Sequence, residues 1–325
     1  PIIADEYVDM SYGTGAVKIT PAHDPNDFEI AKRHDLPLES IISPEGKMIN
    51  VPAQFLGLTP VEARARVLEA LEALELRRGE TEIEHAVGHC YRCGSVIEPM
   101  IKEQWFIKTQ SLAQPAIDAL KKEKITFYPA SKRKELIAYL EQLKDWNISR
   151  QIPWGIPIPA FVNENDPKDW IFDTRTNEQS IVVNDTTYIR EEDTFDTWFS
   201  SGQWPYIVTD YLTDGDLANY FPTDMMETGM DIMRAWVSRM IILSLYRTGK
   251  LPFKEVYLHG MVNDEHNQKM SKSKGNVINP MELVAEFGSD ATRMGLISGR
   301  APAQSQAFNR GSVIAARNFC NKLWN

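Results

Sequence analysis

The sequence predicts an α/β protein built around a parallel sheet, and two observations carry this prediction. In the final third of the chain, short apolar strands alternate with helices, the order typical of a parallel sheet with helices on its faces. The composition is that of an ordinary globular protein, with 43% apolar and 25% charged residues. A length of 325 residues allows two domains, or one domain that carries insertions.

The first third is expected to hold two strands joined by a glycine turn, two helices and a tight knuckle at the cysteines. Residues 16–20 (AVKIT) are apolar and β-branched, as in a strand. Asp24 followed by Pro25 is typical of an N-cap and the first turn of a helix. A longer helix is predicted over 59–79, ending at Gly79. Its apolar face has the helical spacing of Val61, Ala65, Leu68, Leu71 and Leu74.

The middle of the chain combines a strand at 104–108, a basic run and a polar stretch over about 163–193 that we interpret as a surface insertion. The basic run surrounds a predicted helix start and contains Lys121, Lys122, Lys124, Lys132, Arg133 and Lys134. The net charge of −10 argues against wholesale coating of nucleic acid, so a polyanion would meet a local patch such as this one. A solvated helix face is the alternative.

The final third predicts strand 224–229, a helix over 231–249, strand 255–262, a lysine-rich loop and a helix over 280–288. Residues 308–325 read as a further helix whose apolar partner is missing. No apolar run reaches the roughly 20 residues of a membrane span. Three cysteines are too few for a disulfide framework, which predicts a reducing, cytoplasmic compartment.

The lysine-rich loop places Lys269, Lys272 and Lys274 within six positions, directly after a predicted parallel strand. Ligands of open α/β sheets bind beyond the carboxyl ends of the strands. Ammonium groups make point-charge contacts to phosphates, so a triphosphate would reward three of them. The interpretation that competes with this one is a solvated basic surface loop.

The string KMSKS at 269–273 resembles the signature loop of class I aminoacyl-tRNA synthetases. Further blocks resemble the valine-specific members of that family in the right order: GTGAVKITPAHDPNDFE, DWNISRQ, DTFDTWFSSG, ETGMDIMRAWVSRM and EVYLHGMV. DTWFSSG and AVKITPAHDPND differ from the isoleucyl and leucyl types, which remain the alternatives within the family. The resemblance covers nearly the whole chain and is weakest over 163–193.

The resemblance implies a domain organisation. Residues 1–104 would be the C-terminal part of an inserted, β-rich editing domain. Residues 105–300 would be the second half of a Rossmann-like catalytic domain, and 301–325 the start of a helical anticodon-binding bundle. The family's His-x-Gly-His signature is absent from the sequence. We therefore expect an internal fragment that is inactive alone.

The implied reaction joins valine to tRNA(Val) through valyl-adenylate, with ATP and Mg²⁺, in a monomeric enzyme. By resemblance, Lys272 and Lys269 are the catalytic cations. The implied ATP and adenylate site comprises Gly229, Asp231, His259, Gly260, Met261, Val262 and Ser271. The implied valine pocket comprises Trp198, Asp231 and Ile232. A core tryptophan at Trp198 and a helix N-cap at Asp231 are the structural alternatives.

Members of the family also edit, which means that they hydrolyse wrongly charged tRNA. Editing is needed because an apolar pocket rejects an added hydroxyl only weakly, and the discrimination of valine against threonine is the established example. A second site must recognise the hydroxyl by hydrogen bonds. By resemblance its residues are Lys18, Thr20, His23, Asp24 and Asp27, with His23 near the tRNA terminus and a positioned water as nucleophile. A capping-box pair of Asp24 with Asp27 is the alternative.

Cys90 and Cys93 form one C-x-x-C knuckle, half of a zinc site. With no second pair in the sequence, a reduced, metal-free knuckle is preferred over structural Zn²⁺.

Two other functions compete with the ligase: an editing-only aminoacyl-tRNA hydrolase and a non-catalytic RNA-binding module. The lysine loop and the implied pocket residues argue against both, since neither function needs them.

Overall fold

The computed structural model describes residues 1–80, 82, 84–90 and 93–325. The chain divides into two compact units, residues 1–103 and residues 104–325, which are treated separately below. None of the helices in the described ranges is long and apolar enough to cross a bilayer.

Unit 104–325 contains the predicted parallel sheet. Its strands are β10 (Thr223–Gly229), β11 (Phe253–His259) and β2 (Thr126–Tyr128), in the order β10, β11, β2. Both neighbouring pairs are parallel, and Gly229 lies opposite His259 in the register. The carboxyl ends of β10 and β11 therefore meet at one edge of the sheet. The predicted strand 255–262 ends earlier than expected, at His259.

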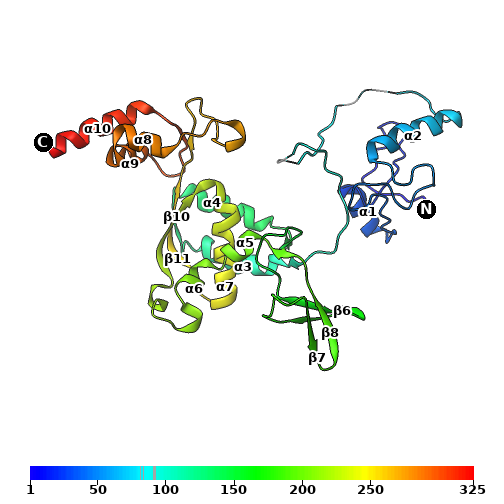
Figure 1. Ribbon diagram of the computed structural model, residues 1–325, viewed down its shortest axis with the longest axis horizontal. Coiled ribbons are helices and arrows are strands. Elements are labelled where there is room, and N and C mark those ends of the chain that lie inside the picture. Colours follow the sequence, from blue (N-terminus) through cyan, green and yellow to red (C-terminus); the bar gives the residue numbers. More distant parts are fainter. Residues whose placement is uncertain (81, 83, 91–92) are drawn as a thin grey trace. The chain divides into compact units, whose positions relative to one another are not determined.

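Helices pack on this sheet and form the main core with it (Figure 1). They are α3 (Thr109–Lys121), α4 (Ser131–Glu141) and α7 (Ser238–Thr248). The core includes Leu120, Leu136, Val237, Met240, Ile241, Val256 and Leu258, all almost fully buried. The helix predicted over 231–249 starts irregularly: a 3₁₀ turn, η3 (Met230–Ile232), and a π turn, η4 (Met233–Val237), precede α7. π turns of this kind are frequent at functional sites.

Antiparallel strands occupy the middle of the unit. The polar stretch that we interpreted as an insertion forms most of a separate four-stranded sheet in the order β6-β5-β8-β7 around Phe161, Ile181 and Tyr188. Its strands are β5 (Ala160–Asn163), β6 (Asp166–Phe172), β7 (Ser180–Val183) and β8 (Thr186–Arg190). Two short pairs join β1 (Phe106–Ile107) to β3 (Trp146–Asn147) and β4 (Ser149–Arg150) to β9 (Thr194–Phe195). The connection to β10 holds α5 (Thr197–Ser201), α6 (Trp204–Val208), η1 (Tyr211–Thr213) and η2 (Ala218–Tyr220).

The C-terminal part of the unit is a small helical cluster. Its elements are β12 (Val262–Asn263), η5 (Lys272–Lys274), α8 (Pro280–Phe287), α9 (Ser289–Ile297), β13 (Gln306–Ala307) and α10 (Arg310–Trp324). The predicted helices at 280–288 and 308–325 are confirmed. The expectation that the last helix lacks an apolar partner is wrong for its first turns, since Val313 and Ala316 are buried and Val313 packs with α8 and α9. At the end of the helix, Leu323 and Trp324 are 71% and 92% exposed.

Unit 1–103 is less regular than expected. Helix α1 (Pro25–Arg33) begins as predicted, with Asp24 as N-cap. Helix α2 (Pro60–Ala73) begins with a capping box of Thr59 and Glu62, but it ends before Leu74, not at Gly79. Glu75 adopts φ +58°, a left-handed conformation that terminates the helix by itself. Most of the apolar face expected to be buried is exposed, including Val61 and Leu74.

The strand predicted over 16–20 is wrong, and the described part of residues 1–103 contains only the isolated bridges Ile42–Met48 and His89–Val96. A strand exists only where a partner segment completes its hydrogen bonds, and none of the described segments pairs with residues 16–20. The expected β-rich character is therefore not found in the described residues of this unit.

Candidate active site

The carboxyl ends of β10 and β11 open onto a cavity of about 360 Å³. Glu227 and His259 line it from the strand ends, and Arg300 and Gln304 line it from the segment after α9. His259 Nδ1 is hydrogen-bonded to the Glu227 carboxylate. The cavity lies where the sheet topology predicts a ligand, because both strands end at this edge.

Gly229, the last residue of β10, brings the chain close to Asp231. A Cβ at position 229 would lie 2.7 Å from Asp231 Oδ1. Glycine has no Cβ and therefore leaves room for the carboxylate where it lies. Asp231 lies in the first turn of η3. It caps no backbone N–H there, which disfavours the N-cap alternative.

Asp231 Oδ2 accepts a hydrogen bond from Lys269 Nζ at 3.3 Å. The two residues are 38 positions apart, and their side chains are 36% and 68% exposed. The structure thus brings the first lysine of the KMSKS loop to the carboxylate beyond β10. Sequence spacing alone could not predict this contact.

Residues 260–262 are packed against the segment before α10. A Cβ at Gly260 would lie 2.0 Å from the carbonyl oxygen of Gln304. The Met261 N–H donates to Ser305 Oγ at 3.0 Å, and Val262 pairs with Gln306 in the parallel β12–β13 bridge. Residues 304–306 therefore hold in place the backbone of residues 260–262, which the resemblance implies to lie along the adenine.

The KMSKS loop has a hydrogen-bonded base. Asp264 is buried and accepts from the backbone N–H groups of His266 and Gln268, while Asn276 Nδ2 donates to its other oxygen at 2.8 Å. Asn276 Oδ1 in turn accepts from Ser271 N at 2.9 Å. The Asn276 side chain, followed by the backbone N–H groups, lowers the pKa of Asp264 below its ordinary value of 3.8.

The tip of the loop is the turn η5, with Ser271 as N-cap and Gly275 at φ +68°. Lys272 and Lys274 are exposed on this turn, and the described residues provide neither with an ion pair. Of the three loop lysines, Lys269 is held by a carboxylate and the other two project from the tip. A mobile cation at the tip above a fixed base suits contact with a phosphate.

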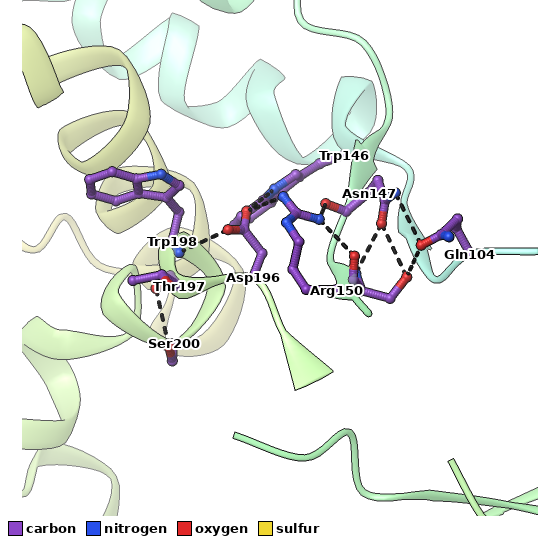
Figure 2. Close-up of polar contacts among 9 residues, drawn as sticks. Gln104, Trp146, Asn147, Arg150, Asp196, Thr197, Trp198 and Ser200 are labelled. Atoms are coloured by element: carbon purple, nitrogen blue, oxygen red, sulfur yellow. Dashed lines mark hydrogen bonds and ion pairs between the residues drawn. The ribbon is translucent and has the colours of Figure 1, made fainter. Parts of the chain in front are cut away.

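Two blocks that are far apart in the sequence meet in a partly buried polar network, in which Trp146 and Asp196 are buried (Figure 2). Asp196 Oδ2 accepts from Trp146 Nε1 at 2.9 Å and pairs with Arg150 at 3.1 Å. Arg150 also donates to the carbonyl oxygens of Asn147 and Ser149. Sequence reasoning quoted both blocks but assigned no role to Asp196 or Arg150, since 46 positions separate them and no local spacing links them.

Trp198 and Ile232 remain to be placed. Trp198 lies in α5, and Figure 2 shows its indole directed away from Asp196. It packs at the edge of a cluster with Trp146, Tyr206 and Leu243, and it is half-buried. Ile232, at the end of η3, is also half-buried. The valine pocket that the resemblance implies from these two residues stays a prediction.

The profile of the family described as tRNA synthetases class I (I, L, M and V) matches residues 27–307. The chain belongs to this family. The match spans the sheet, the KMSKS loop and the network of Figure 2.

Within the class I synthetases, the chain is similar to valine–tRNA ligases over its whole length. It is 44% identical to that of Symbiobacterium thermophilum and 44% identical to that of Treponema denticola, and it covers 36% of each. It therefore spans little more than a third of these relatives. Methionyl-tRNA synthetase of Mycobacterium tuberculosis in complex with methionyl-adenylate matches in fold, with a TM-score of 0.51 and 20% identity, over 74% of this chain and 42% of that one.

The residues implied in editing lie around the start of α1 of this class I chain. Lys18 Nζ donates to Thr20 Oγ1 at 2.8 Å, and the Thr20 N–H donates to Asp27 Oδ2 at 2.5 Å. Asp24 Oδ1 caps the helix by accepting from Asn26 and Asp27. Asp24 is therefore an N-cap as the alternative held, but the Asp27 carboxylate binds Thr20 instead of returning to the Asp24 backbone. The structure brings Lys18, Thr20 and Asp27 together.

His23 has both ring nitrogens in backbone contacts. Nε2 accepts from the Ile41 N–H at 2.9 Å, which leaves the proton on Nδ1 to donate to the Pro99 carbonyl at 2.8 Å. The imidazole thus joins three segments of unit 1–103. This arrangement favours a structural role for His23 over contact with tRNA.

Near the cysteine pair Cys90 and Cys93, the Gly94 N–H donates to the Cys90 carbonyl oxygen at 2.8 Å, and Gly94 has a φ of +73°. His89 Nδ1 contacts the Gly94 carbonyl at 2.7 Å, and Cys93 Sγ donates to Ser95 Oγ at 3.3 Å. In the thiolate form, the Ser95 hydroxyl, the Ser95 N–H and then the Cys90 side chain hydrogen-bond to the sulfur, and they lower the pKa of Cys93 to about 7. In the described part of the chain, no group of three or more His, Cys, Asp or Glu side chains is placed to hold a metal ion. Two cysteines are half of the four ligands that a structural zinc site needs.

Proposed function

We propose that this chain contributes the second half of the catalytic domain to an enzyme that attaches valine to tRNA(Val) through valyl-adenylate. One observation carries the proposal: the KMSKS loop reaches the carboxyl edge of the parallel sheet, where Lys269 meets Asp231. The identity of 44% to valine–tRNA ligases over the whole chain supports valine as the amino acid.

In adenylate formation, a carboxylate oxygen of valine attacks the α-phosphorus of ATP, and the bond from that phosphorus to the bridging oxygen breaks to release pyrophosphate. Negative charge grows on the departing phosphates, where a cation lowers the barrier. Lys272 is assigned this role because it is the second lysine of the KMSKS string, the position that stabilises the ATP phosphates in the family it resembles, and because it is exposed at the loop tip. Gly260, Met261 and Val262 would line the adenine and His259 would flank it, with Ser271 shaping the loop.

Lys269 and Asp231 form a pair that the substrates would exchange for new partners. ATP phosphates compete for the Lys269 ammonium, and the α-ammonium of valine then replaces it on the Asp231 carboxylate. Magnesium would arrive on the phosphates of ATP, since the described residues include no cluster of carboxylates for it. Trp198 and Ile232 are assigned to the apolar wall that faces the valine side chain.

The test restores the rest of the enzyme by placing residues 1–325 in the corresponding segment of the Treponema denticola valine–tRNA ligase. Lys272→Ala in this chimera should lower the rate of valine-dependent pyrophosphate exchange about 10²- to 10³-fold, the usual cost of one lost transition-state contact. Lys274→Ala is the matched control, because it removes the same charge from the same turn and should leave the rate nearly unchanged. Equal losses in both variants would contradict the proposal.

We further propose that residues 1–104 belong to an editing domain that hydrolyses threonyl-tRNA. The support is the chain of contacts from Lys18 through Thr20 to the buried Asp27 carboxylate, which could recognise a hydroxyl and an ammonium group. Asp24 caps the helix that carries Asp27. Residues 105–300 and 301–325 are assigned to the catalytic domain and the helical bundle of a monomeric enzyme.

Asp27→Ala in the chimera should leave valine activation unchanged and allow threonyl-tRNA(Val) to accumulate, measured by acid-gel separation of charged tRNA. Asp35→Ala is the control, since Asp35 lies on the exposed turn after the same helix. Normal clearance of threonyl-tRNA by the Asp27 variant would show that the hydrolytic site lies elsewhere.

A further inference from the structure

A second cavity lies at the opposite edge of the parallel sheet. It measures about 400 Å³ and is lined by the segments that lead into the three strands: Lys124 precedes β2, Pro222 precedes β10 and Leu251 precedes β11. The seven residues of β10 separate this edge from the carboxyl edge by roughly 20 Å. The proposed adenylate site therefore cannot account for this cavity.

Three lysines converge on the cavity from two different loops. Lys122 and Lys124 lie on the turn after α3, and Lys250 lies on the turn after α7. Asp118 is the one carboxylate in the lining, and its Oδ1 already accepts from Gln114 Nε2 at 2.8 Å. The lining thus carries three positive charges and one negative charge.

Three of the four neighbouring basic residues of the same run, all except Lys134, are neutralised by ion pairs. Lys121 pairs with Glu141 at 2.7 Å, Lys132 pairs with Glu135 at 2.6 Å, and Arg133 pairs with Glu123. By contrast, Lys122, Lys124 and Lys250 form no ion pair with any residue in the described ranges. The Lys250 ammonium lies 4.9 Å from the centre of the Tyr211 ring, a contact that positions the charge without cancelling it.

The helix ends explain only part of this excess. Helices α3 and α7 both terminate here, and each C-terminus carries about half a negative charge. Three lysines and one aspartate then leave about one positive charge without a counterpart, in a chain whose net charge is −10. The apolar wall of Pro115, Ala119, Leu245 and Leu251 gives the cavity the mixed lining typical of a small-molecule site.

We propose that this cavity binds a small phosphate-bearing anion, either a phosphomonoester or a diphosphate. The three lysines without ion pairs gather at this one cavity. An RNA backbone would instead need a row of cations that follows its repeated phosphates. The ion pairs of Lys121, Lys132 and Arg133 remove such a row. The sequence predicted that a polyanion would meet the basic run at residues 121–134. The proposal replaces this prediction with a site for one small anion at Lys122, Lys124 and Lys250.

The test follows the acetylation rate of each lysine in the intact chain by mass spectrometry, with inorganic phosphate or diphosphate as the probe. Sodium chloride at equal ionic strength controls for screening. Diphosphate should slow acetylation of Lys122, Lys124 and Lys250 several-fold and leave Lys121 unchanged. If inorganic phosphate also slows acetylation of these three lysines, the site binds phosphomonoesters. If only diphosphate slows it, the site binds diphosphates.

Variants separate this site from the KMSKS loop. Lys122→Gln with Lys124→Gln should abolish the protection of Lys250, whereas the control Lys121→Gln and the loop variant Lys272→Ala should retain it. The proposal is overturned if about 10 mM diphosphate, well above the range of weak ligands, protects no more than sodium chloride does. It is also overturned if a duplex RNA protects these lysines and neither inorganic anion does.

Discussion

At the scale of single residues, the contacts at the strand ends contribute little to stability. Lys269 and Asp231 are 68% and 36% exposed, and an ion pair of this kind is worth about 0–1 kcal/mol. A Cβ at position 229 would lie 2.7 Å from Asp231 Oδ1, so the carboxylate would have to shift if residue 229 were not glycine. The pair therefore places two opposite charges at the strand ends with little effect on stability.

Gly260→Ala tests the close approach of residues 260 and 304. The φ angle of Gly260 is not in the left-handed region, so space alone forbids the methyl group, which would lie 2.0 Å from Gln304 O. We expect a loss of about 1–3 kcal/mol or more in the free energy of unfolding, measured by urea titration. Ser305→Ala removes only the acceptor of the Met261 N–H and should cost about 1 kcal/mol. A Gly260 variant as stable as the parent chain would contradict the close packing.

At the scale of elements, the KMSKS loop combines a fixed base with a free tip. The carboxylate of Asp264 and the amide of Asn276 connect residues 264–276 by hydrogen bonds, and Met270 packs against the α8–α9 cluster. Lys272 lies on the tip turn beyond this base. The hydrogen bonds therefore fix the base of the loop at the sheet edge and leave Lys272 and Lys274 exposed at its tip.

The pKa of Asp264 gives this arrangement a pH signature. Because the folded pKa is depressed, the stabilisation from the ionised carboxylate is fully present above its ordinary value of 3.8 and is lost as the pH falls through the lower folded value. Asn276→Ala removes the largest cause of the depression, so the titration midpoint of the Asp264 carboxyl, followed by ¹³C NMR, should rise toward 3.8. Asn279→Ala, which only uncaps α8, should leave the midpoint unchanged. An unchanged midpoint in the Asn276 variant would disprove the assigned cause.

At the scale of the whole molecule, the two units differ in how they are stabilised. The main core of unit 104–325 draws on α3, α4, α7 and all three parallel strands. The named cluster of unit 1–103 consists of Ile42, Met48 and Ala63 with a few partly buried neighbours. Since burial of apolar surface is the main stabilising term, the larger unit should fold independently.

Residues 104–325 expressed alone should unfold in urea at the same midpoint as the whole chain. All eight tryptophans lie in this unit, so their fluorescence reports its unfolding in both proteins. The matched measurement on residues 1–325 is the reference. A midpoint that falls by more than the error of the titration would mean that unit 1–103 stabilises the sheet.

The sequence by itself determined two of the three parallel strands, β10 and β11, the helices at 280–288 and 308–325, and the Asp24 N-cap, because periodicity and capping are local properties. It also identified the KMSKS loop and the family. It did not predict the third parallel strand, β2. It failed for residues 16–20, because a strand depends on a partner that no local pattern contains. The contact of Lys269 with Asp231, the network of Arg150 with Asp196, and the pairing of half the basic run were decided only by the tertiary structure. Each of these contacts joins residues that are distant in the sequence. Only the folded structure therefore determines which charged groups meet.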